Sequence, residues 1–169
     1  MNTHPLWHNF FRSGTDIHHV VADLWKKTPL FKNISWRRCL TLSRMMHIRR
    51  YKKGELIFKD GEIGLGVAMI ISGNVHIKTG GHLLADLRTG DFFGEIALVI
   101  DEPRTANAIA VEDVELAFFL RPDLEEFINQ FPKHGAIFMF NLSKVLANRL
   151  REANAMLREN KNFLEGGSN

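Results

Sequence analysis

Gly94, Glu95, Arg104 and Thr105 have residue types and a spacing that suit the binding of a small phosphorylated ring. Arg104 follows Glu95 by nine positions (104 − 95). An arginine offers a planar, permanently charged fork to a phosphate. A carboxylate accepts a hydrogen bond from a sugar hydroxyl, and a threonine hydroxyl both donates and accepts. The four residues therefore predict a site for one phosphate and one ribose hydroxyl.

The backbone around Glu95 adds neutral donors to this site. Gly94 has no Cβ, so the chain can come close to a ligand there. Residues 95–98 are expected to form one short helical turn. The free N–H groups at the start of such a turn, here those of Ile96 and Ala97, make an anion site.

The run Gly90–Leu98, followed by Pro103–Ala106, resembles the phosphate-binding cassette of the cyclic nucleotide-binding domain family. The resemblance extends over residues 28–152, through 29–31, 51–58, 60–62 and 70–75. It implies a domain that binds a 3′,5′-cyclic nucleotide, with cAMP expected first. Many family members have alanine where this chain has Thr105, whose hydroxyl could also reach a guanine amino group. The sequence therefore leaves cGMP open.

The resemblance assigns two groups of ligand-binding residues. Phosphate and ribose are expected to contact Gly94, Glu95, Ile96, Ala97, Arg104 and Thr105. The base is expected to contact Ile77, Ala85, Leu87, Phe93 and Asn154. Plainer interpretations stay open at this point: Glu95 as a structural ion-pair partner of Arg104, the base group as ordinary core, and Asn154 as a solvent-facing side chain.

Length and composition limit the other possibilities. The chain has 169 residues, which suits one domain, and 45% of them are hydrophobic, with 13 Phe to build a core. Cys39 is the single cysteine, which rules out an intrachain disulfide and fits a reducing cytoplasm. No apolar run approaches about 18 residues, so no membrane segment is expected. The histidines show no metal-ligand spacing, and nucleophile-elbow and Walker motifs are missing, so no enzyme is expected.

Charge is unevenly spread, although the net charge is only +3. Residues 24–54 contain no acid and ten Lys or Arg. A solvated basic face and a docking surface for an acidic partner or nucleic acid both fit this pattern.

The pattern of elements indicates a mainly β fold with flanking helices. Helices are expected over 16–27, which Thr28-Pro29 ends, and over 35–46. From His47 the hydrophobic period changes to two, and turn signals separate short strands. The expected strands are 56–58, 67–71, 75–78, 82–87, 105–111 and 114–120. The resemblance makes them an antiparallel β jelly roll, or double-stranded β-helix, with N-terminal helices and C-terminal B and C helices. We divide the chain into an N-terminal arm and helix (1–27), a nucleotide-binding roll with a flanking helix (28–131) and a C-terminal lid or dimerisation helix (132–169).

The last helix is expected from about residue 133 to 163, since no Gly or Pro occurs from 136 to 164. A heptad seam follows Met139, Leu142, Leu146, Arg149, Ala153, Met156, Asn160 and Phe163. Its early part is expected to pack on the roll, and the rest predicts a parallel homodimer. In the family this helix also closes over the ligand.

These features predict a regulatory module that turns nucleotide occupancy into movement of its C-terminal helix. No helix-turn-helix, kinase or pore segment follows that helix in this sequence, so direct DNA binding is not expected. Two expectations stay open: the chain acts on an effector protein in trans, or it is a piece of a longer protein. Two alternatives stay open: a nucleotide-independent protein-interaction module with the same fold, and a metal-dependent enzyme of the cupin type.

Overall fold

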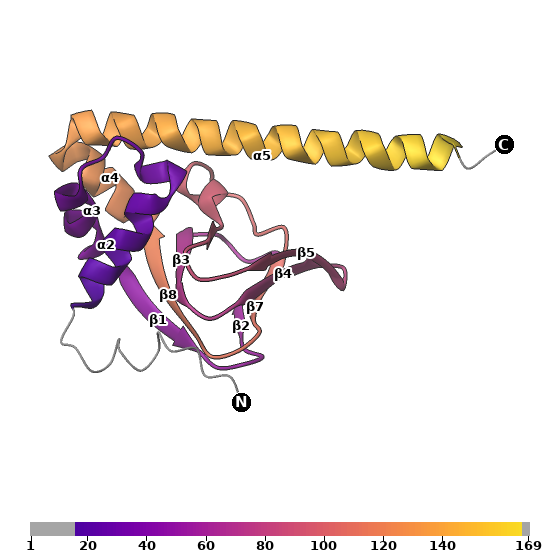
Figure 1. Cartoon of the computed structure of the whole chain (residues 1–169), viewed down its shortest axis with the longest axis horizontal. Helices are drawn as coiled ribbons and strands as arrows, with labels where there is room; N and C mark the ends of the chain where they lie inside the picture. The colour runs from indigo at the N-terminus through magenta and orange to yellow at the C-terminus, as the bar shows by residue number, and fades with distance from the viewer. Residues whose placement is uncertain (1–15, 167–169) are drawn as a thin grey trace.

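The computed structural model describes residues 16–166, with side chains to residue 158. Two four-stranded antiparallel sheets form a β roll (Figure 1). The first has the order β1-β8-β3-β6 and the second β2-β7-β4-β5. Their bounds are β1 His47–Tyr51, β2 Leu56–Phe58, β3 Gly66–Ser72, β4 Val75–Thr79, β5 His82–Leu87, β6 Phe92–Phe93, β7 Asn107–Ala110 and β8 Val114–Leu120. The expected jelly roll is confirmed.

The interior of the roll is an apolar cluster shared by both sheets. Ala68 and Leu116 enter it from the first sheet, and Val75 and Ala108 from the second. Alternate residues of each strand point to one face, so these short strands place one row inside and leave the other outside. Ile77, Leu87 and Phe93 from the predicted base group pack into this same cluster.

Most strands lie where the sequence predicted them. The bounds of β2, β5 and β8 match, while β7 begins two residues later than expected and ends one residue earlier. Two strands were not predicted. β1 is an edge strand whose His47, Arg49 and Arg50 are exposed, so it lacks a hydrophobic signal. β6 has only two residues and forms by pairing with β3.

The N-terminal helices cover the outer face of the first sheet. Helix α2 (Ile17–Lys27) begins where the Asp16 side chain accepts the His18 N–H at 3.0 Å. A 3₁₀ turn, η1 (Pro29–Phe31), and helix α3 (Trp36–Ser43) follow, and α3 ends three residues before its predicted end. Trp25 and Phe31 bury against Met69 and Phe119 in a second, larger cluster.

Two helices complete that cluster. Helix α4 (Arg121–Gln130) contributes Phe127, and α5 (Pro132–Gly166) contributes Phe138, Leu142 and Val145. The early part of α5 thus packs on the body of the chain, as predicted. The C-terminal end of α5 projects past the roll (Figure 1). Every described side chain from 147 to 158 is exposed. No helix within residues 16–166 is both long enough and apolar enough to cross a membrane.

Part of the basic run between residues 24 and 54 is used inside the chain. Arg50 pairs with Glu115 and Lys52 with Asp113 across 2.8 Å each. The Arg38 guanidinium lies 3.9 Å from the Phe131 ring centroid. Three arginines of this run are exposed: Arg37 on α3, Arg44 just after α3 and Arg49 on β1. They suit either a solvated basic face or a docking surface for an acidic partner or nucleic acid.

Asn141 connects α5 to the segment after α2. Its buried side-chain amide donates to the Leu30 carbonyl at 2.9 Å and to the Lys32 carbonyl at 2.7 Å. We expect Asn141→Ala to lower the free energy of unfolding by about 1–3 kcal/mol, because two carbonyls lose their donor. Denaturant unfolding checks this. Asn148→Ala, at an exposed position of the same helix, is the control, and equal stability of the two variants would contradict the prediction.

Candidate functional site

The predicted turn after Gly94 is present as the 3₁₀ helix η2 (Glu95–Leu98). Gly94 has a φ of +79°, in the left-handed region that favours glycine. A Cβ built at Gly94 would lie 2.4 Å from Nη1 of Arg104. The backbone conformation therefore favours glycine here, and a larger residue would also displace the Arg104 guanidinium.

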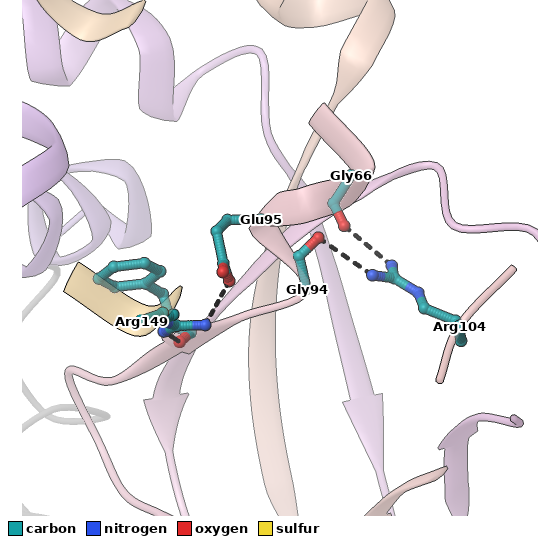
Figure 2. A network of polar contacts seen from close by, with 6 residues as sticks. Gly66, Gly94, Glu95, Arg104 and Arg149 are labelled. Atoms are coloured by element: carbon teal, nitrogen blue, oxygen red, sulfur yellow. Dashed lines mark hydrogen bonds and ion pairs between the residues drawn. The ribbon is translucent and has the colours of Figure 1, made fainter. Parts of the chain in front are cut away.

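Arg104 points back toward this turn and not into bulk solvent (Figure 2). Its Nη1 donates to the Gly94 carbonyl at 3.0 Å and its Nη2 to the Gly66 carbonyl at 2.9 Å. The guanidinium also lies 4.3 Å from the Phe58 ring centroid. Burial lowers the pKa of Arg104, and the nearby Glu95 carboxylate raises it. A guanidinium stays protonated at neutral pH despite such a shift, so the site holds a half-buried positive charge.

Glu95 is the most deeply placed polar group of the turn, with 1% of the residue exposed. Its Oε2 accepts from Nη1 of Arg149 at 2.5 Å, and Nη2 of Arg149 donates to the Phe92 carbonyl at 3.2 Å (Figure 2). The Arg149 guanidinium lies 5.2 Å from the Phe92 ring centroid. Helix α5 is thus connected to the turn through one ion pair.

Sequence reasoning placed Arg149 in a dimer seam and missed this contact with Glu95. The available signal was its polarity within a mostly apolar seam. Arg121 was missed as well. Its guanidinium donates to the Ala97 carbonyl at 2.7 and 3.1 Å and to the Ile100 carbonyl at 2.7 Å, and it pairs with Asp101. Arg121 therefore holds the end of the turn from the start of α4.

The other predicted phosphate and ribose residues lie at the same place. Ile96 is exposed on the turn, while Ala97 is buried and its N–H donates to the Gly94 carbonyl at 3.2 Å. Thr105 is exposed directly after Arg104. The structure thus brings Gly94, Glu95, Ile96, Ala97 and Arg104 together, with Thr105 beside them.

The predicted base residues divide into two sets. Ile77 and Ala85 are opposite each other on β4 and β5, and the Phe93 ring centroid lies 5.7 Å from that of Phe58, the residue that Arg104 covers. Asn154, in contrast, is an exposed residue of α5.

A groove of about 860 Å³ lies elsewhere, between η1 and α5. Phe92, Phe140, Lys144 and Arg149 line it together with Lys32. Gly94, Glu95 and Arg104 do not line the groove, so it is separate from the η2 turn. Arg149 belongs to both places, because it lines the groove and also pairs with Glu95. Among residues 16–166, no group of three His, Cys, Asp or Glu side chains could hold a metal ion.

Comparison with known proteins identifies a family and relatives of this chain. Residues 48–131 match the family model of the cyclic nucleotide-binding domain. The cyclic AMP receptor protein of Thermus thermophilus is 34% identical over 137 residues, which cover 78% of this chain and 62% of that protein. The cGMP-dependent protein kinase of Plasmodium berghei is 36% identical over 85 residues, or 50% of this chain and 10% of the kinase. The chain thus spans less than two thirds of each of these relatives.

Solved structures give the same result. The catabolite activator protein of Thermus thermophilus superposes with a TM-score of 0.71 at 33% identity, over 79% of this chain and 63% of that one. A cyclic nucleotide-binding domain from Methylobacillus flagellatus superposes with a TM-score of 0.73 over 85% of this chain and 84% of that one. At 21% identity, this second likeness shows the fold alone.

Arg121 generates a prediction about the turn itself. We expect Arg121→Ala to destabilise residues 95–100 locally by about 1.5–3 kcal/mol, since three hydrogen bonds from a charged group are lost. Amide hydrogen exchange of the turn should become faster, while that of β8 should change less. Arg88→Ala, which removes an exposed arginine beside Asp86, is the control. Unchanged exchange at residues 95–100 would show that Arg121 does not hold the turn.

Proposed function

Because the chain belongs to the cyclic nucleotide-binding domain family, we propose that it binds a 3′,5′-cyclic nucleotide, cAMP first and cGMP as the alternative. One observation carries this proposal: the Arg104 guanidinium lies at the η2 turn, hydrogen-bonded to Gly94 beside the buried Glu95. A positive charge, a turn with N–H donors and a carboxylate acceptor then meet in one place. These are the groups that a cyclic phosphate and a ribose hydroxyl require.

Each residue has a proposed role in holding the ligand. Arg104 neutralises the phosphate, because a buried unpaired charge costs several kcal/mol. The N–H groups of Ile96 and Ala97 donate to the phosphate oxygens. The Ala97 N–H gives up its long hydrogen bond to the Gly94 carbonyl to do so. Glu95 accepts the ribose 2′-hydroxyl. Its second carboxylate oxygen is available for this, because the bond to Arg149 uses Oε2.

The base is proposed to contact Ile77, Ala85, Leu87 and Phe93 of the roll and Asn154 of α5. Thr105 stands beside Arg104 and supplies a hydroxyl to the phosphate or to a guanine amino group. The relatives carry both cAMP and cGMP in their names, so the choice of base is left to measurement.

Binding is proposed to act on the position of α5. In this proposal residues 28–131 hold the nucleotide and residues 132–169 form the lid. Arg149 contacts Glu95, which is the proposed ribose acceptor. A ligand that changes the hydrogen bonding of Glu95 changes the free energy of the Glu95–Arg149 pair, and only such a difference can shift a helix between two positions.

A parallel homodimer through α5 is the second part of the proposal. Leu142 and Arg149 are used within one chain, which leaves a neighbouring seam for a second copy. Its positions alternate steps of four and three: Met139, Ser143, Leu146, Leu150, Ala153 and Leu157. Leu150 and Leu157 are 63% and 66% exposed, so burial in a coiled coil would remove much apolar surface from water.

Calorimetric titration with cAMP and with cGMP tests the ligand. We expect Arg104→Ala to weaken binding by about 2–5 kcal/mol, or roughly 30- to several-thousand-fold, because the phosphate loses its countercharge. A 2′-deoxy analogue should bind less tightly, because it lacks the hydroxyl that donates a hydrogen bond to Glu95. Arg88→Ala is the matched control. If the wild-type chain gives no heat with either nucleotide, the alternative of a nucleotide-independent interaction module replaces this proposal.

The dimer is tested separately by sedimentation equilibrium. We expect wild-type chains to associate and Leu150→Glu to shift them toward monomers, since like charges in an a or d position oppose pairing. Leu56→Glu introduces the same charge at an exposed leucine of β2 and should leave association unchanged. A monomeric wild-type chain would refute this part of the proposal.

A further inference from the structure

Five exposed aliphatic side chains gather on the outside of the η2 turn and on the segment beside it. We name this surface the cassette patch, and its members are Ile63, Leu65, Ile96, Val99 and Ile100. Each is between 46% and 63% exposed. Large exposed apolar clusters are uncommon on folded proteins and mark contact surfaces.

The two segments of the cassette patch lie against each other at Gly64 and Ala97. Ile63 forms an isolated β-bridge with Pro103. A Cβ at Gly64 would lie 2.7 Å from Cβ of Ala97, so residue 64 sits directly on the turn. Ile63 and Leu65 flank that buried glycine at alternate positions. The five side chains therefore belong to one continuous region.

Several hydrogen bonds hold this region in place. The Arg121 backbone N–H donates to the Leu65 carbonyl at 2.9 Å, and its side chain donates to Ala97 and Ile100. The Arg104 N–H donates to the Glu62 carbonyl at 2.7 Å. Arg121 thus fixes both segments at once, and the apolar side chains stand on an ordered backbone.

The charges around the cassette patch are mostly negative. The exposed acids on the same two segments are Asp60, Glu62, Asp101 and Glu102, of which Asp101 is paired with Arg121. Arg104 is turned onto Gly94 and Gly66, which leaves Lys59 as the exposed base of these segments. A negative rim opposes contact with nucleic acid or an anionic lipid surface and favours a cationic partner.

We propose that the cassette patch docks a partner protein through a segment that carries apolar side chains flanked by Lys or Arg. An apolar centre with a charged rim is the usual anatomy of a protein interface. This docking surface does not depend on nucleotide binding. Its regulation rests on the proposed function, because Ile96 belongs both to the patch and to the proposed phosphate site.

Selection of displayed random peptides of about 16 residues against the whole chain tests the proposal. We expect the enriched peptides to combine Leu, Ile or aromatic residues with Lys or Arg. Fluorescence polarisation with synthetic copies should show binding that weakens as salt is added. The double variant Leu65→Ser/Ile100→Ser should weaken it about tenfold or more, by loss of the apolar centre. Leu84→Ser, at an exposed leucine of β5, is the control and should leave peptide binding unchanged.

Each other outcome has a definite meaning. Enrichment of acidic peptides, no enrichment, or equal binding to both variants would overturn the docking surface. Self-association that the double variant abolishes would make the occupant a second copy, which also overturns it. If peptides bind the patch while cAMP and cGMP give no calorimetric heat, the docking surface stands and the proposed ligand fails. Circular dichroism of both variants verifies that they fold.

Discussion

The ion pair between Glu95 and Arg149 is the contact on which the arrangement of this molecule depends. Glu95 is almost completely buried, and a buried carboxylate is tolerated only when a charged or hydrogen-bonding partner compensates for its lost hydration. That partner comes from α5, 54 residues further along the chain. The roll therefore needs the helix to satisfy the carboxylate, and the helix is held at the roll by the same bond. Asn141 also holds α5 in place, through carbonyls that follow α2.

Arg104 shows how the roll prepares a cationic site. Two carbonyls and one aromatic ring fix its guanidinium in the structure. The two terminal nitrogens each use one contact here, while a guanidinium offers five N–H donors in all. An anion that approaches the η2 turn would therefore meet an oriented fork with donors to spare. Such preorganisation lowers the entropic cost of binding.

The sequence predicted much of this architecture because its signals are local. Alternating apolar residues and turn glycines marked most strands, and the short turn after Gly94 was expected from its residues. β1 and β6 were missed because their pairing depends on β8 and β3 and not on their own composition. Arg149 and Arg121 were missed for the same reason, since their contacts span 54 and 24 residues. An arginine's partner over such distances is decided by tertiary packing, which no local pattern contains.

The η2 turn lies where three different demands meet. Its N–H groups are the proposed phosphate donors, Glu95 holds α5 through Arg149, and Ile96 is one of the five members of the cassette patch. Arg121 restrains the carbonyl end of this turn from the first residue of α4. A four-residue turn fixed at both ends cannot change one of these contacts independently of the others. Under the proposed function, a nucleotide that shifts the Glu95–Arg149 pair would alter the free energy of binding elsewhere on this turn, and such reciprocal coupling is what a regulatory domain requires.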